Sequence, residues 1–361
     1  MTERSVVIAP DSFKGSLAAA DVAAAIAQGW REVRARDSLV LLPQADGGEG
    51  TMDAVEATQA GSTRHWVDGV TGPDGRPVRG CWLELADGTA VTELAQMSGL
   101  PLMQAPDPLN ATSFGLGQVI DDAVSHGVKH LIVGLGGSAS TDGAAGALVA
   151  LGLELLDVSG RPLPPGGSAL DRLASIRGAV RRPERLTILT DVTSPLLGPT
   201  GAAAVFGPQK GALPAEVAVL DAALARLATV LGGPTDLPGM GAAGGCGYGL
   251  VTGLGGTLVP GAAYISRLTG YDDAVRSADI VISGEGRFDS TSLQGKVVGH
   301  VLGLAARHGA RRAVVAGQVA VRPDDLWTES LVGLAGAVPP AMAHPHRWLV
   351  EAGRRAAAAL G

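Results

Sequence analysis

Five short loops of the 361-residue chain combine glycines with acidic, basic or hydroxyl side chains. Each loop follows a short apolar run, and runs of this length predict buried strands. In open α/β sheets, ligands bind beyond the carboxyl ends of the strands. The shared position of the five loops therefore indicates a ligand-binding site more strongly than any single motif does.

The first loop follows residues 5–9 and has the sequence PDSFKGS. Lys14 would lie near the N-terminus of the next helix, where an anion can bind, and Ser12 precedes it in the same loop. An exposed lysine in an ordinary strand–helix loop is the alternative. We expect Ser12 to bind substrate or phosphate and Lys14 to take part in catalysis.

The second loop starts at Asp46 and has the sequence DGGEGT. Asp46 and Glu49 lie three residues apart among glycines, a pattern that suits a hydroxyl acceptor or a metal–water network. The two carboxylates could also cap a helix and stabilise its first turn, and the two roles are compatible. We expect Asp46 to be catalytic.

The third loop runs into a predicted helix and has the sequence GLGGSASTDG over residues 134–143. Backbone N–H groups and hydroxyls that converge at a helix N-terminus can hold phosphate. The loop is not a Walker A motif, because G-x-x-x-x-G-K-[ST] does not occur in the chain, and Ala139 breaks the pattern G-x-G-x-x-G. The residues expected to bind substrate or phosphate here are Gly136, Gly137, Ser138 and Asp142.

The fourth loop follows a predicted strand at residues 187–190. Its first residue, Asp191, could hold Mg²⁺ or act as a base, or it could form an Asx turn. Lys210, further along in FGPQKG, could pair with phosphate or be solvated. We expect Asp191 to be catalytic and a metal ligand, and Lys210 to bind phosphate or substrate.

The fifth loop, GEGRFDSTS, contains Glu285 and Asp289, and Lys296 opens the following helix. Carboxylates for Mg²⁺ beside a lysine for phosphate are the groups that phosphoryl transfer needs. Either carboxylate could instead cap the helix or pair with Arg287. We expect Glu285 and Asp289 as metal ligands and Lys296 as a catalytic residue.

The composition predicts a globular protein with a large core. Hydrophobic residues make up 46% of the chain, charged residues 17%, and the net charge is −7. Nucleic-acid binding needs a basic face, which such a chain does not supply. Two distant cysteines and an N-terminal apolar run too short for a signal peptide favour the cytoplasm. Residues 237–266 lack charge but contain ten glycines, which favours buried loops and strands over a membrane helix.

Strand and helix patterns alternate at both ends of the chain. For example, Val22, Ile26 and Trp30 recur every four residues, which predicts a helix with one apolar stripe. We expect residues 1–66 and 267–361 to form one discontinuous α/β domain, a Rossmann/flavodoxin-like doubly wound parallel sheet. Residues 67–266 would form a second α/β domain inserted into the first, and the cleft between the two would be the natural ligand site.

Seven segments resemble, in order, those of the type I glycerate kinase family of bacteria. They are IAPDSFKGSL, ADGGEGT, TELAQMSGL, GLGGSASTDG, DVTSPLLGPTGAAAVFGPQKGA, GAAGGCGYGL and SGEGRFDSTSLQGK. Residues 141–144, 194–195 and 291–292 depart from the family's usual Asn-Asp-Gly-Gly, Asn-Pro and Gln-Thr, but the departures keep the charged residues. The resemblance therefore covers most of the chain and all five loops.

The resemblance implies a phosphotransferase with an alcohol acceptor, which uses ATP and Mg²⁺ to convert D-glycerate into 2- or 3-phosphoglycerate. It also implies two α/β domains, one inserted in the other. Under this hypothesis the glycine loop at 136–138 steadies the phosphates, and Lys14 and Lys296 neutralise negative charge. Two alternatives stay open: a kinase for another small hydroxy or sugar acid, and a non-catalytic metabolite-sensing regulator on the same fold.

Overall fold

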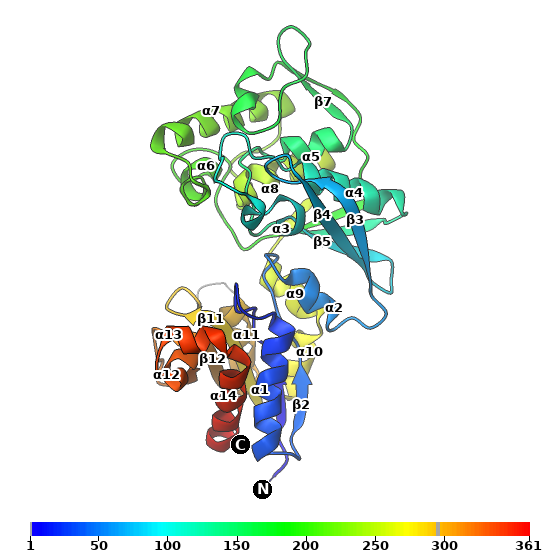
Figure 1. Cartoon of the computed structure of the whole chain (residues 1–361). Coiled ribbons are helices and arrows are strands. Elements are labelled where there is room, and N and C mark those ends of the chain that lie inside the picture. Colours follow the sequence, from blue (N-terminus) through cyan, green and yellow to red (C-terminus); the bar gives the residue numbers. More distant parts are fainter. Residues whose placement is uncertain (1, 294–296) are drawn as a thin grey trace. The chain divides into compact units, whose positions relative to one another are not determined.

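Figure 1 shows the computed structural model of the chain, which describes residues 2–293 and 297–361. The chain divides into two compact units. Unit 1 consists of the residues up to Asp46, Asp53–Ala60 and Ala262–Gly361, and unit 2 consists of Gly47–Met52 and Gly61–Gly261. Each unit contains parallel strands and helices, which confirms the predicted α/β class.

Unit 1 is built on a sheet of five parallel strands in the order β13-β12-β11-β1-β2. Its central strand, β11, pairs with β1 on one side and β12 on the other. From β1 the chain moves outward to β2, whereas from β11 it moves in the opposite direction through β12 to β13. The bounds are β1 Ser5–Ile8, β2 Ser38–Leu41, β11 Ile280–Phe288, β12 Arg311–Val319 and β13 Trp327–Ser330.

Helices cover both faces of the unit 1 sheet because its strands alternate apolar side chains between the faces. Val6 and Ile8 pack in one cluster with α1 (Ala19–Val33) and α14 (Pro345–Leu360). Val7 packs in another cluster with α10 (Tyr271–Ala274) and α11 (Val297–Arg307). The predicted stripe of α1 is fully buried. The other helices of this part of the chain are α2 Thr51–Glu56, α9 Gly261–Leu268, α12 Leu331–Ala335 and α13 Val338–Ala343.

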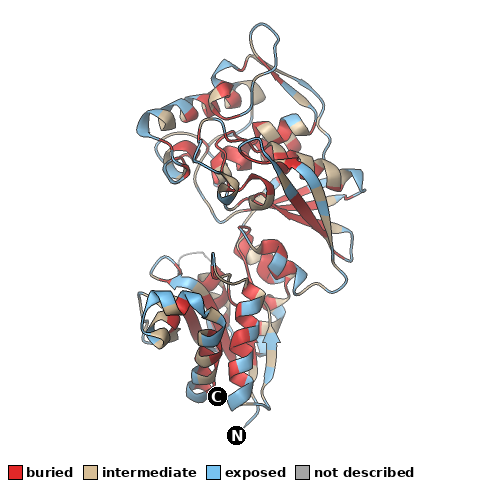
Figure 2. Ribbon diagram, viewed as in Figure 1, coloured by how far each residue is buried: buried red, intermediate tan, exposed pale blue. Residues whose placement is uncertain are grey.

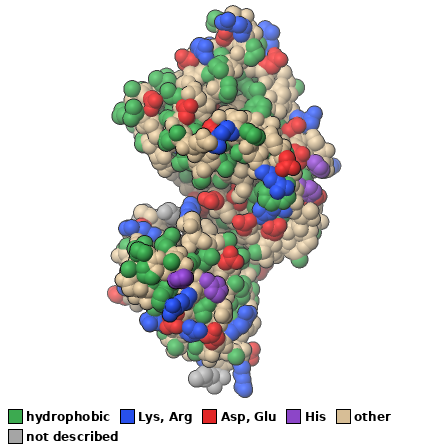
Figure 3. Space-filling model, viewed as in Figure 1, with side chains coloured by type: hydrophobic (Ala, Val, Ile, Leu, Met, Phe, Trp, Pro, Cys, Tyr) green, Lys and Arg blue, Asp and Glu red, His purple; other side chains and the backbone are tan. Residues whose placement is uncertain are grey.

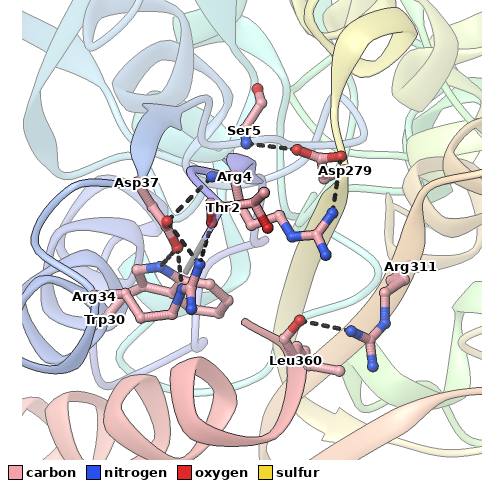
Figure 4. A network of polar contacts seen from close by, with 9 residues as sticks. All are labelled: Thr2, Arg4, Ser5, Trp30, Arg34, Asp37, Asp279, Arg311 and Leu360. Carbon is pink, nitrogen blue, oxygen red and sulfur yellow. Dashed lines mark hydrogen bonds and ion pairs between the residues drawn. The ribbon is translucent and has the colours of Figure 1, made fainter.

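A polar network lies where β1 begins (Figure 4). Arg34 pairs with Asp37 at 2.6 Å, and the Trp30 Nε1–H donates to the same carboxylate at 3.0 Å. Burial alone would raise the pKa of Asp37, but the hydrogen bonds from Arg34 and Trp30 hold it below its ordinary value. Because the network lies at the amino end of β1, these charges stabilise the fold and lie away from the strand ends at which ligands bind.

Unit 2 contains a six-stranded mixed sheet in the order β10-β9-β6-β5-β4-β3. The first four strands are parallel, and β4 and β3 extend the sheet as an antiparallel hairpin. A separate pair is formed by β7 and β8. The bounds are β3 Thr63–Thr71, β4 Pro77–Glu84, β5 Thr89–Glu93, β6 His130–Gly134, β7 Leu153–Leu156, β8 Ser175–Gly178, β9 Arg185–Leu189 and β10 Thr257–Val259.

Small residues let helices of unit 2 pack closely against one another, and Figure 2 shows the buried residues concentrated in the strands and on the inner helix faces. Gly117 of α4, for example, leaves no room for a Cβ, which would lie 2.3 Å from the Ala147 carbonyl oxygen of α5. The helices are α3 Ala95–Ser98, α4 Phe114–Ser125, α5 Ala145–Ala150, α6 Ala202–Phe206, α7 Pro214–Leu231 and α8 Ala242–Leu254.

The expectation of buried loops and strands over residues 237–266 is wrong in part. This stretch forms α8, the short strand β10 and α9. Ala243, Gly244 and Gly245 adopt left-handed backbone conformations inside α8 and kink it. The glycines thus kink α8 but do not prevent the helix from forming. In the part of the chain that the structure describes, no helix is long and apolar enough to cross a membrane.

Candidate active site

Unit 1 has a cavity of about 450 Å³ at the carboxyl ends of its strands. Asp11 follows β1, Asp46 follows β2 and Glu285 belongs to the last part of β11, and all three line the cavity. Strands β1 and β11 are neighbours from which the chain moves outward in opposite directions. In open α/β sheets such a reversal leaves a crevice in which ligands bind. The sequence and the sheet order therefore bring three carboxylates to one ligand-binding position.

The carboxyl group of Asp11 is strongly perturbed by its surroundings in the cavity. Burial raises the pKa of Asp11 to about 7, and the nearby negative charges of Asp46 and Glu285 raise it as well. The Ser12 N–H, which donates to Asp11 Oδ1 at 2.6 Å, and the Lys14 ammonium act in the opposite direction. A carboxyl group with a pKa near neutrality exchanges a proton readily at physiological pH.

Cationic side chains line the same cavity. Lys14 is exposed, and its charge acts on Asp11. Arg287, near the end of β11, also lines the cavity. Ser12 lines it too, so the structure brings together the predicted residues Ser12, Lys14, Asp46 and Glu285. The cavity can therefore bind a ligand that carries several negative charges, with carboxylates beside the cations.

Asp289 has local partners and does not line this cavity. Its Oδ1 accepts hydrogen bonds from the N–H and hydroxyl of Thr291, at 2.9 and 2.7 Å, and its Oδ2 lies 3.6 Å from Arg287 Nε. The alternative interpretation of Asp289 as a partner of Arg287 is thus realised in the structure. The predicted Lys296 lies outside the described residues.

In unit 2, the second and third glycine loops are packed backbone against backbone. The Gly136 N–H donates to the Gly47 carbonyl oxygen at 3.1 Å. A Cβ on Gly136 would lie 2.3 Å from the Gly48 Cα, and one on Gly134 would lie 2.4 Å from the Gly47 carbonyl oxygen. Only glycine permits this approach, which explains why both loops are rich in it.

The packing of the second loop against the third uses some of the N–H groups of the third loop and leaves others for a ligand. The Gly136 N–H donates to the Gly47 carbonyl oxygen, and its binding of phosphate stays a prediction. The N–H groups of Gly137 and Ser138 donate no hydrogen bond within the described part of the chain. Gly137 is exposed and has a left-handed backbone (φ 78°). Gly137 and Ser138 are therefore the better candidates for backbone donors to an anion.

Asp142, near the end of the third loop, is fully buried. Its Oδ2 accepts hydrogen bonds from the N–H and hydroxyl of Ser113, both at 2.8 Å, and from the Gly146 N–H at 3.2 Å. Its Oδ1 accepts from the Ser140 hydroxyl at 3.0 Å. These bonds make Asp142 a support of the loop, and its binding of substrate or phosphate stays a prediction.

Lys210 is buried as well, with 2% of the residue exposed. Its Nζ donates to the Ser138 hydroxyl at 2.8 Å and to the Ser140 carbonyl oxygen at 2.5 Å. Burial lowers the pKa of Lys210 to about 8, although the neighbouring Cys246 and Asp142 favour its charged form. Lys210 therefore stabilises the third loop through buried hydrogen bonds. A solvated lysine, or a lysine exposed for phosphate binding, would not be buried in this way.

We expect Lys210→Met to lower the free energy of unfolding by about 2–4 kcal/mol, because it leaves the Ser138 hydroxyl, the Ser140 carbonyl and the Asp142 charge without their buried partner. Urea denaturation measures the change. Lys129→Met is the matched control, since Lys129 pairs with Glu184 at the surface and its side chain is 77% exposed. Equal losses in the two variants would show that Lys210 does not support the loop.

Asp191 lies in unit 2, just after β9. Its Oδ1 accepts a hydrogen bond from the Gly261 N–H at 2.9 Å, and the residue is exposed. This hydrogen bond is not an Asx turn, because an Asx turn needs a backbone N–H two residues further along, whereas Gly261 lies 70 residues from Asp191. The predicted metal set thus has Asp191 in unit 2 and Glu285 with Asp289 in unit 1, and it stays a prediction.

Two carboxylates, one in the first loop and one at the end of β5, are not predicted as functional residues from the sequence. Asp11 stands in the first loop beside the predicted Ser12, and it is distinguished by a pKa that desolvation and the charges of Asp46 and Glu285 raise. Glu93 is 1% exposed, and its carboxylate accepts from the Met52 N–H at 2.5 Å and the Gly50 N–H at 3.2 Å. The signal for Glu93 was a carboxylate at the end of an otherwise apolar predicted strand, since such a group needs buried donors.

The donor chemistry of the unit 1 cavity fits Mg²⁺. Mg²⁺ prefers oxygen ligands, and proteins hold it with one or two carboxylates together with phosphate oxygens and water. Asp46 and Glu285 both line the cavity, and their negative charges act on Asp11. Within residues 2–293 and 297–361, no group of three or more His, Cys, Asp or Glu side chains is arranged to hold a metal ion by itself. A Mg²⁺ ion here would need oxygens from the substrate.

A family model and known relatives match most of this chain. The model of the glycerate kinase family matches residues 6–360. Glycerate 2-kinase of Escherichia coli K12 is 42% identical over 316 residues, which cover 84% of this chain and 82% of the relative. Glycerate kinase of Bacillus subtilis 168 is 40% identical over 349 residues, which cover 93% and 91%.

A solved structure has the same architecture. It is a crystal structure of a protein assigned as glycerate kinase 2 from Salmonella typhimurium LT2. The TM-score is 0.85 at 37% sequence identity, and the match covers 99% of this chain and 98% of the other. At this identity and coverage the likeness extends to the sequence as well as to the fold.

Proposed function

We propose that this chain, which belongs to the glycerate kinase family, transfers the terminal phosphoryl group of ATP to a hydroxyl of D-glycerate. The observation that carries the proposal is the convergence of Asp11, Asp46, Glu285 and Lys14 on one cavity at the strand ends of unit 1. Phosphoryl transfer depends mainly on positioning and on neutralising charge, which such a group of acids and cations can do.

In the proposed reaction, Asp11 accepts the proton of the glycerate hydroxyl. The hydroxyl oxygen forms a bond to the γ-phosphorus of ATP, while the bond from that phosphorus to the β–γ bridging oxygen breaks, and ADP leaves. Lys14 compensates the negative charge of the transferring group. The sequence motifs alone favour Asp46 or Asp191 as the proton acceptor, but the raised pKa of Asp11 makes it the better base.

We further propose that Asp46 and Glu285 hold Mg²⁺. When bound, the ion would screen the phosphate charges and orient the γ-phosphate. Asp191, Asp289 and Lys296, which the sequence also indicates, stay candidates for metal or phosphate binding. In unit 2, Gly137 and Ser138 would bind an anionic group of a substrate through their N–H groups, while Lys210 and Asp142 keep that loop in place.

The finer description of the fold is part of this proposal. The five parallel strands with helices on both faces support a Rossmann/flavodoxin-like, doubly wound unit 1. The chain order, in which most of unit 2 lies between the two main segments of unit 1, supports an inserted α/β domain. The two cysteines, Cys81 and Cys246, are buried and form no disulfide, which supports a reducing compartment such as the cytoplasm.

ADP release measured with and without an acceptor tests the function. We expect ATP-dependent ADP release with D-glycerate and much slower release with lactate or tartronate. Preference for another acid would favour a different hydroxy-acid kinase. ATP and glycerate binding without ADP release would favour a metabolite-sensing regulator and overturn the proposal.

The pH dependence of kcat/KM tests the role of Asp11. Its carboxylate form accepts the proton, so kcat/KM for MgATP, which reports the enzyme before the ion binds beside Asp46 and Glu285, should fall as the pH falls through about 7, where the group becomes protonated. Asp46→Asn removes one of the charges that raise the pKa of Asp11, so the midpoint should move to lower pH. A profile that is flat from about pH 5 to pH 9, or an unmoved midpoint, would assign the proton transfer to another group.

A further inference from the structure

We infer that the apolar end of the unit 1 cavity binds the adenine base of the nucleotide, with the phosphates directed toward Lys14. The inference rests on the proposed function, because it takes ATP as the phosphoryl donor. It adds the position of the base, its contacts and the direction of the nucleotide along the sheet.

The order of the strands separates the cavity into a charged end and an apolar end. The carboxylates and Lys14 come from the loops and strand ends of β2, β1 and β11. The next strands along the sheet are β12 and β13, and there the cavity is lined by Gln318 and by α12 and α13. Neighbouring strands are about 4.8 Å apart, so β1 at the charged end and β13 at the apolar end, three spacings apart in the sheet, are separated by about 14 Å.

The apolar end exposes side chains that the fold itself does not bury. Val338 is 44% exposed and Met342 is 55% exposed, and they stand four residues apart, on one side of α13. Val332 of α12 lines the cavity beside them. Figure 3 shows hydrophobic side chains gathered over this corner of unit 1. Exposed apolar side chains that line a cavity are typical of a ligand-binding wall.

The size and chemistry of the cavity fit a nucleotide better than glycerate. At about 450 Å³ the cavity lies in the range of about 300–1,000 Å³ that holds cofactors and ligands of similar size. Glycerate has three carbons, all bearing oxygen, and so offers no apolar surface to Val338 and Met342. A purine base has two apolar faces and a polar edge, and the Gln318 amide stands at the border of the apolar end, where it can bond to that edge.

The charges fix the direction of the nucleotide. A base against α13 places its phosphates toward β11 and β1, where Arg287 and Lys14 can bind them. The opposite direction would bring the phosphates against apolar side chains and the base among carboxylates. The γ-phosphate would then lie nearest to Asp11 and Glu285, as the proposed transfer requires.

The test compares ADP with inorganic tripolyphosphate, which has no base, by calorimetric titration. In the double variant Val338→Ala/Met342→Ala we expect the Kd for ADP to rise about tenfold, because apolar contact area is lost. The Kd for tripolyphosphate and the KM for glycerate should change less than about twofold. Val158→Ala, at a residue 93% exposed in unit 2, is the control and should leave all three constants unchanged.

A single change that keeps the length of the side chain, Met342→Gln, repeats the test without opening space. It should also weaken ADP binding and spare tripolyphosphate. If the wild type phosphorylates glycerate and both variants keep the Kd for ADP, the base lies elsewhere and the inference fails alone. A rise in the KM for glycerate with an unchanged Kd for ADP would assign the cavity to the acceptor. If the variants weaken ADP binding but the wild type forms no phosphoglycerate, the base site stands and the proposed function fails.

Discussion

Asp11→Asn should lower kcat for glycerate-dependent ADP formation by about 10²- to 10³-fold. The amide cannot accept the hydroxyl proton, and it also removes one negative charge from the group formed with Asp46 and Glu285. The fold should be retained, because the ionised carboxylate is destabilised by its burial and by like charges, so its loss removes an unfavourable interaction. Steady-state assays and a thermal unfolding curve separate the two effects.

Asp21→Asn is the matched control for this change. Asp21 is exposed in the first turn of α1, a few residues further along the chain, and does not line the cavity. Its replacement should leave kcat within about twofold of the wild type, since Asp21 does not line the cavity. The lost charge near the helix terminus should lower the free energy of unfolding by no more than about 1 kcal/mol. If both variants lose activity equally, or if Asp11→Asn turns over normally, Asp11 has no part in the reaction.

Gly136→Ala should lower the free energy of unfolding by about 1–3 kcal/mol and reduce kcat at least tenfold. Its Cβ would lie 2.3 Å from the Gly48 Cα, and this neighbour is backbone, which cannot rotate away as a side chain can. The two glycine loops of unit 2 would have to separate, and the Gly136–Gly47 hydrogen bond would be lost. Urea denaturation and kcat measure the two losses.

Gly303→Ala gives the opposite expectation for the same chemical change. Gly303 lies inside α11, and nothing stands within 4 Å of the position that its Cβ would take. Alanine should therefore stabilise the protein by about 0.5–1 kcal/mol through its higher helix propensity. Should Gly136→Ala be as stable and as active as Gly303→Ala, the packing of the two loops would not matter for function.

The sequence predicts the chemistry of the loops better than the roles of single residues. Loops after strands are recognisable because apolar runs and glycines are local signals. Asp11 could not be preferred over Ser12 or Lys14, because its raised pKa depends on burial and on charges that come from two other strands. Such effects arise only in the folded chain.

Lys210 illustrates the same limit. Its loop offered two interpretations, phosphate binding and solvation. The structure presents a third, a buried ammonium that bonds to both the Ser138 hydroxyl and the Ser140 carbonyl oxygen. Burial of a lysine depends on partners far along the chain, which spacing cannot reveal. The glycines over residues 237–266 led to the partly wrong prediction of loops and strands there. The helix α8 tolerates its glycines because they form a kink within it.

The most direct test of the account is the product of one reaction mixture, followed by ³¹P NMR. Wild-type protein with ATP, Mg²⁺ and D-glycerate should produce ADP and a phosphate monoester of glycerate in equal amounts, and Asp11→Asn should produce neither over the same time. Formation of the monoester at the wild-type rate by Asp11→Asn would contradict the proposed site. Absence of the monoester with the wild type, although ATP binds, would contradict the function itself.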